Sequence, residues 1–128
     1  MTALQINRDP KAVHVALKAY RNVADNWALP AHQAAALVDM SPGKWRGARR
    51  PNYRGRINVD QMLRLSALIG IYRSLELYFD TPIARRWILL PNQGPLFAGD
   101  KPVERMIDRG LPYMLSVRHY LEDRLEGH

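Results

Sequence analysis

Residues 34–50 read AAALVDMSPGKWRGARR and carry the signals of two short helices joined by a tight turn. Ser41 is a favoured helix cap, and Pro42 follows it at the first helical position, where proline is well tolerated. Asp39 stands in the turn and accepts left-handed φ at modest cost, although glycine is more usual there. The side chains expected to fix the crossing of the two helices are Ala34, Ala35, Val38, Met40, Trp45 and Ala48.

The same stretch opens a strongly basic window. From Ser41 to Arg56 the chain contains six Lys or Arg residues and no Asp or Glu. A window with one sign of charge is the electrostatic footprint expected for a polyphosphate, and a basic second helix after a tight turn suits the DNA major groove. The other interpretation is a helical hairpin followed by a solvated basic loop. The residues predicted to bind DNA are Ser41, Lys44, Arg46, Arg49, Arg50, Arg54 and Arg56.

Composition supports a globular, basic protein. The chain has 128 residues with 47% hydrophobic side chains, enough for one real core or for two small helical units. Residues 1–63 hold ten Lys or Arg against four Asp or Glu, whereas residues 64–128 hold nine against eight. There is no cysteine, which excludes disulfides and thiolate chemistry. The absence of a long apolar run or a signal-like start predicts a soluble cytoplasmic protein.

The spacing of apolar residues predicts an all-α fold. Apolar side chains recur at three and four positions, and no segment alternates as a strand would. Proline, glycine and cap residues divide the chain into short helices, the first of which is capped by Asp9 before Pro10. The expected helices run from Pro10 to about Trp27, from Pro30 to about Met40, from Pro42 to about Arg49, from Asn58 or Val59 to about Phe79, from Thr81 to Pro91, from Pro102 to Arg109, and from Pro112 to about Leu125.

The longest of these helices has an unusually broad apolar face. Met62, Leu65, Leu68 and Phe79 belong to it, so the helix is expected to pack on two sides and to support a homodimer. Gly70 lies in the middle of this helix, where glycine costs about 1 kcal/mol against alanine. Its presence predicts the close approach of a neighbouring helix.

Several spaced motifs follow one another in the second half. They are RLSALIGIYRSL at residues 64–75, WILLPN at 87–92, LFAG at 96–99, KPVE at 101–104, and Gly110. Together they resemble the toxin-binding domain of the Xre/MbcA/ParS antitoxins over residues 64–122, and residues 34–48 resemble the helix-turn-helix of Xre-type regulators. The resemblance implies a helix-turn-helix DNA-binding domain at residues 1–58 and a small helical toxin-binding domain at 59–128. Within these motifs Trp87 is expected to anchor the core.

That resemblance also implies a function. Such antitoxins neutralise RES-domain toxins, which consume NAD or use it for ADP-ribosylation, and their C-terminal region blocks the NAD pocket of the toxin. This chain is then expected to be a type II antitoxin that represses its own operon through operator DNA, with no cofactor, metal or catalysis of its own. The residues expected to contact the toxin lie on the polar side and end of the last helix and are Arg118, His119, Glu122, Arg124, Glu126 and His128.

Three other function classes stay open at this point. An enzyme is disfavoured because the four histidines show no metal-ligand spacing, and neither a phosphate-binding loop nor a nucleophile elbow is present. A stand-alone transcription regulator would use the C-terminal half only to dimerise. A basic accessory protein would bind nucleic acid without sequence preference.

Overall fold

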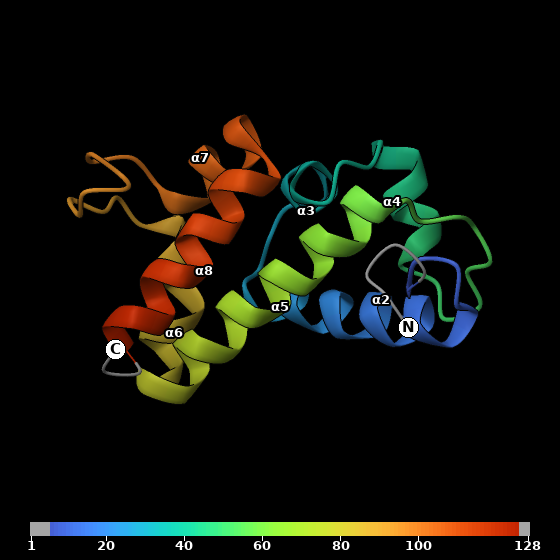
Figure 1. Cartoon of the computed structure of the whole chain (residues 1–128), viewed down its shortest axis with the longest axis horizontal. Coiled ribbons are helices and arrows are strands. Elements are labelled where there is room, and N and C mark those ends of the chain that lie inside the picture. Colours follow the sequence, from blue (N-terminus) through green and yellow to red (C-terminus); the bar gives the residue numbers. More distant parts are fainter. Residues whose placement is uncertain (1–5, 126–128) are drawn as a thin grey trace. The chain divides into compact units, whose positions relative to one another are not determined.

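The computed structural model describes residues 6–125, and within that range the chain forms seven α-helices, one short 3-10 helix and no strand (Figure 1). The all-α class predicted from the sequence is therefore confirmed. The chain divides into two compact units, Met1–Ser66 (unit 1) and Ala67–His128 (unit 2). The elements are α2 (Pro10–Asn26), α3 (Ala31–Leu37), α4 (Pro42–Ala48), α5 (Val59–Tyr78), α6 (Thr81–Arg86), the 3-10 helix η1 (Trp87–Leu89), α7 (Pro102–Arg109) and α8 (Leu111–Leu125).

Helix α2 begins as the sequence predicts. The Asp9 side chain accepts a hydrogen bond from the amide of Lys11, and Pro10 occupies the first helical position. Its inward face is formed by Leu17, Tyr20, Val23 and Ala24, which are all buried.

Tyr20 joins α2 to both helices that follow it. Its hydroxyl donates a hydrogen bond to the carbonyl oxygen of Ala34 over 2.8 Å, and its ring meets the Trp45 ring edge-on at 5.2 Å between centroids. Ala34 stands in the last turn of α3, where carbonyl groups lack helical partners. The Tyr20 hydroxyl therefore satisfies one of these carbonyls inside the core.

Helix α5 buries much of the face that suggested a dimer. Leu65, Leu68 and Leu75 are fully buried within the monomer, while Met62 and Phe79 are half-buried. These three leucines are therefore not available for a dimer contact. The explanation expected for Gly70 changes as well, because a Cβ atom there would meet the guanidinium of Arg118 on α8, at 2.6 Å, rather than a helix backbone.

The centre of unit 2 is Phe97, which no solvent reaches. Its ring makes edge-on contacts with Trp87, Tyr113 and Tyr120 at centroid distances of 5.4, 6.4 and 5.7 Å. Trp87 itself is only half-buried. The prediction that Trp87 anchors this core is therefore wrong. Phe97, on the turn between η1 and α7, has that role.

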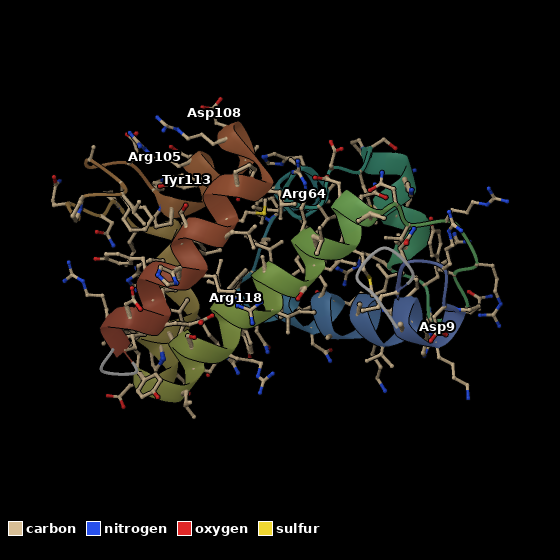
Figure 2. The ribbon with its side chains drawn as sticks, in the orientation of Figure 1. Asp9, Arg64, Arg105, Asp108, Tyr113 and Arg118 are labelled. Atoms are coloured by element: carbon tan, nitrogen blue, oxygen red, sulfur yellow. The ribbon has the colours of Figure 1, made fainter. Side chains whose placement is uncertain are left out.

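Two side chains hold this turn against α7 and α8. Arg105 Nη1 and the Tyr113 hydroxyl both donate to the carbonyl oxygen of Leu96, over 3.1 and 2.7 Å, and Figure 2 shows the two side chains beside each other. Arg105 also pairs with Asp100 at 3.0 Å. Burial raises the pKa of Tyr113, and the nearby Arg105 charge partly opposes this shift.

Candidate functional site

The first candidate site is built on α3, the turn after it, and α4. Helix α3 ends at Leu37 rather than continuing to Met40, because Asp39 takes a left-handed φ of 53° and the Met40 amide turns back to the carbonyl of Ala35. The left-handed conformation predicted for Asp39 is confirmed. All six side chains predicted to fix the crossing are buried, namely Ala34, Ala35, Val38, Met40, Trp45 and Ala48.

A buried glutamine ties this turn to the start of α5. Gln61 donates from Nε2 to the carbonyl oxygen of Asp39 over 2.9 Å. Its Oε1 accepts from the Asn58 amide, and its own amide donates to Asn58 Oδ1, which is the reciprocal pattern of a capping box. The spacing Asn58-x-x-Gln61 could have revealed this cap from the sequence, but the link to Asp39 requires the fold. Gln61 therefore sets where α5 begins relative to the turn.

Helix α4 starts with the predicted cap. Ser41 Oγ accepts a hydrogen bond from the Lys44 amide over 3.1 Å, and Pro42 follows at the first helical position. Lys44 departs from its expected position, because its side chain is half-buried and its Nζ lies 3.5 Å from Gln61 Oε1. Arg46, one turn of helix away from Pro42, is exposed.

Arg49 lies at the end of α4 and contacts one acidic and one aromatic side chain. Its Nη2 pairs with Asp25 Oδ1 on α2 at 2.8 Å, and its guanidinium stands 5.6 Å from the centroid of the Trp45 ring. Both partners of the ion pair are exposed, so solvent screens the attraction. Arg21 supports the same end of the helix from α2 by donating to the carbonyl oxygen of Ala48.

The other predicted arginines lie on the segment after α4. Arg50, Arg54 and Arg56 are all exposed. Arg54 and Arg56 border a pocket together with the N-terminal end of α2. The structure therefore divides the predicted DNA-binding set into an α4 group, formed by Ser41, Lys44, Arg46 and Arg49, and a loop group, formed by Arg50, Arg54 and Arg56.

The second candidate site is the polar side of α8. Arg118 pairs with Glu122 at 2.8 Å, and His119 Nε2 lies 3.2 Å from Asp123 Oδ2. Arg124 stands 4.9 Å from the centroid of the Tyr120 ring. The predicted toxin-binding residues thus interact along their own helix, each with a residue four positions away. Glu126 and His128 lie outside the described residues.

Unit 2 also exposes large apolar side chains that the sequence pattern did not single out. Among the described residues, seven large hydrophobic side chains are exposed, and five of them belong to unit 2. Ile83 at the start of α6 and Leu115 on α8 expose 54% and 47% of their surface. Helical periodicity could not identify them, because these positions are apolar like those of the core. The five are Leu77, Tyr78, Ile83, Leu90 and Leu115.

Residues 6–125 contain neither a metal-binding cluster nor a membrane-spanning helix. No group of three or more His, Asp or Glu side chains in this range is arranged to hold a metal ion. No helix in the same range combines the length and apolar character required to cross a membrane.

Comparison with known proteins gives no match. Neither a family model, nor a curated protein, nor a solved structure matches this chain.

Proposed function

We propose that this chain is an antitoxin that binds operator DNA through α4 and its flanking arginines, and binds a RES-type toxin through unit 2. The observation that carries the proposal is the division of charge and apolar surface between the units. Unit 1 holds eleven Lys or Arg against four Asp or Glu, whereas unit 2 holds eight against eight. All of the net charge therefore belongs to the unit that contains α4, and most of the exposed large hydrophobic side chains belong to the other.

For DNA, the geometry supports a role for α4. The helix is short, its contacts with α3 are fixed by buried side chains, and it presents Arg46 to solvent with Arg49 at its end. Arginine binds phosphate through paired donors and reads guanine in the same way. Arg49 and Arg50 serve as phosphate contacts in this proposal, and Arg46 is the candidate for the groove.

For the toxin, unit 2 offers exposed apolar side chains and the polar side of α8. Protein interfaces combine an apolar centre with a polar rim, and exposed Ile83 and Leu115 supply apolar groups of the kind found at such centres. The paired side chains of α8 can exchange partners at small cost, because exposed ion pairs contribute little to stability. Occlusion of the NAD pocket by the end of α8 is the mechanism implied by the family resemblance of residues 64–122.

The DNA part is tested by the Arg49→Ala/Arg50→Ala variant. Loss of two phosphate contacts should weaken binding to every DNA sequence alike. It should also make the slope of log affinity against log salt concentration shallower by about two. A matched control is Arg73→Ala/Arg86→Ala, which removes two exposed cations from unit 2. Unchanged binding of Arg49→Ala/Arg50→Ala to the promoter region of its own gene would contradict the assignment.

The toxin part is tested by co-purification with the product of the neighbouring gene. Ile83→Asp should weaken that complex, whereas Val15→Asp, at an exposed position of α2, should leave it intact. Removal of the residues after Leu121 should give a folded protein that still binds DNA but no longer neutralises the toxin. The proposal includes the homodimer expected from the sequence, and light scattering of the free protein tests it. A chain that binds neither its promoter nor a toxin would refute the function as a whole.

A further inference from the structure

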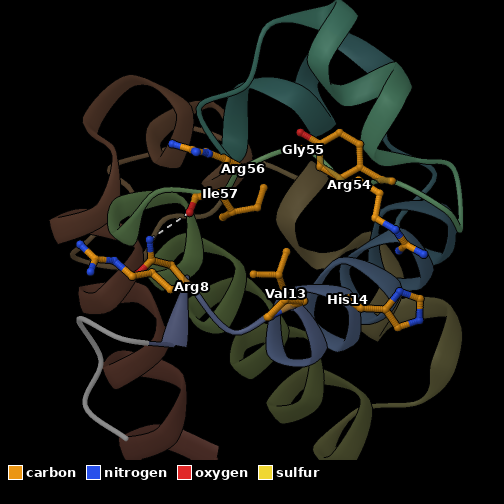
Figure 3. Close-up of a pocket in the computed structure, with 10 residues that line it drawn as sticks. Arg8, Val13, His14, Arg54, Gly55, Arg56 and Ile57 are labelled. Carbon is orange, nitrogen blue, oxygen red and sulfur yellow. Dashed lines mark hydrogen bonds between the residues drawn. The ribbon is translucent and has the colours of Figure 1, made fainter.

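The loop after α4 folds against the N-terminal end of α2 and encloses a pocket of about 600 Å³ (Figure 3). This volume lies within the range of small-molecule binding sites. Ten described residues line the pocket, and none of them is acidic. Neither the DNA-binding nor the toxin-binding role of the chain explains a cavity here.

The walls of the pocket are held in place by contacts within unit 1. Asn7 Nδ2 donates to the carbonyl oxygen of Ile57 over 3.1 Å and joins the start of the chain to the loop. Gly55 has no side chain because a Cβ atom there would overlap the Tyr53 hydroxyl. The Tyr53 ring also reaches α4, where a Cβ atom on Gly47 would be 3.7 Å from it. These contacts join the loop to α4 and to the segment before α2.

The pocket combines an apolar floor with a cationic rim. Val13 and Ile57 occupy its middle, and Figure 3 places Arg8 on one side of them and Arg54 with His14 on the other. The third rim arginine is Arg56.

No carboxylate among residues 6–125 neutralises the rim guanidiniums. Arg8, Arg54 and Arg56 are exposed, and none of them pairs with a described carboxylate, whereas Arg49 is paired with Asp25. The carboxylates closest to them in sequence are engaged elsewhere. Asp9, next to Arg8, caps α2, and Asp60, four residues after Arg56, pairs with Arg64. Three unpaired guanidiniums around one cavity favour an anion with several oxygen acceptors.

One hydrogen-bond acceptor in the pocket wall has no donor among the described residues. Asn7 Oδ1 is buried and accepts no hydrogen bond from any described residue. Buried polar atoms are almost always satisfied, so this acceptor has room for a donor that the described residues do not supply. A ligand that carries hydroxyl or amino groups as well as negative charge fits this requirement better than a simple inorganic anion.

We propose that this pocket binds a nucleoside phosphate. The phosphate lies against the rim formed by Arg8, Arg54 and Arg56, and the sugar or base lies on Val13, Ile57 and the edge of Tyr53. The ligand is either a free mononucleotide or a nucleotide unit of a DNA strand, because both present the same groups. Arg54 and Arg56 also belong to the predicted DNA-binding set, but the pocket requires neither a toxin partner nor the α4 contacts of Arg46 and Arg49.

The test is calorimetric titration of the full chain with AMP, ATP, the dinucleotide pTpT and inorganic phosphate. Val13→Phe places a ring on the floor and should weaken nucleotide binding by at least about tenfold, because the ring occupies the ligand's space. Arg8→Ala removes one charged donor and should weaken it by about five- to tenfold without disturbing the core. The matched controls are Val15→Phe and Lys18→Ala, which make similar changes at exposed positions of α2 and should bind as the wild type does.

The outcomes separate the two sources of the ligand. Binding of AMP or ATP that is sensitive to both pocket variants identifies a free nucleotide, and the same sensitivity with pTpT alone identifies a DNA strand. Either result supports the proposal. Wild-type affinity for all nucleotides weaker than about 1 mM, equal losses in the control variants, or phosphate binding as tight as that of nucleotides would overturn it. Operator binding is measured separately, so failure of the pocket is not confused with failure of the antitoxin function.

Discussion

Asp25 Oδ1 lies 2.8 Å from Nη2 of Arg49, so a carboxylate on α2 holds the arginine at the end of α4. A phosphate that binds Arg49 has to compete with this carboxylate. Asp25→Asn removes the competing charge, and operator affinity should rise by roughly two- to fivefold, in line with the small energy of an exposed pair. Fluorescence anisotropy at several salt concentrations measures the change. Asp108→Asn, which removes an exposed carboxylate from unit 2, is the control, and an equal gain with both variants would show that only net charge matters.

The buried hydroxyl of Tyr20 predicts a pH dependence of stability. Burial raises the pKa of Tyr20 far above its ordinary value of about 10. Below pH 10 the phenol is protonated in both the folded and unfolded states, and its stabilising hydrogen bond to Ala34 is fully present. Above about pH 10 only the unfolded state loses the proton, so stability falls as the pH rises, by up to about 1.4 kcal/mol per pH unit.

Tyr20→Phe should reveal both effects. At neutral pH it leaves the Ala34 carbonyl without its partner and should lower the free energy of unfolding by about 1–3 kcal/mol. Between pH 10 and 11 the variant should lose less stability than the wild type, although Tyr53 and Tyr113, whose pKa values burial also raises, keep part of the alkaline loss. Urea unfolding at both pH values measures the difference. Parallel losses in the two proteins would contradict the assignment.

Gln61 predicts a second loss of stability in unit 1. Gln61→Leu keeps an apolar stem but leaves the Asp39 carbonyl and the Asn58 amide without their side-chain partner. The expected loss in the free energy of unfolding is about 1–2 kcal/mol, because two part-buried backbone groups lose their partners. Gln93→Leu, at an exposed position of the turn in unit 2, should change stability little. Equal stability of the two variants would show that the Gln61 bonds contribute nothing.

Gly70 and Arg118 predict a coupled pair of substitutions. Gly70→Ala should add about 1 kcal/mol of helix stability, but in the wild type the new methyl group displaces the Arg118 guanidinium from its place beside Glu122. The gain should therefore be smaller in the wild type than in an Arg118→Ala background. A double-mutant cycle by thermal unfolding measures this coupling. Identical gains in both backgrounds would place Arg118 away from Gly70 in solution.

The sequence predicted most of the local structure because its signals are local. The caps at Asp9 and Ser41, the prolines after them, and the left-handed Asp39 each depend on residues within one turn of the chain. Two alanines with left-handed φ, Ala28 and Ala98, were not predicted, since alanine carries no preference for that conformation.

The candidate site was harder to predict because it depends on contacts between distant residues. Lys44 turns toward Gln61, seventeen positions away, and Arg49 pairs with Asp25, twenty-four positions away. The pocket exists only because the loop at residues 53–57 returns to the start of α2. No pattern of charge or apolar spacing contains this information.

The position of Arg49 against Trp45 gives the protein a natural optical reporter. The chain has three tryptophans, of which Trp27 and Trp45 belong to unit 1 and Trp87 to unit 2. A Trp87→Phe variant would confine indole emission to unit 1. Withdrawal of the guanidinium from the Trp45 ring by a phosphate would then alter the emitted intensity, so an encounter at α4 could be followed in real time without an attached dye.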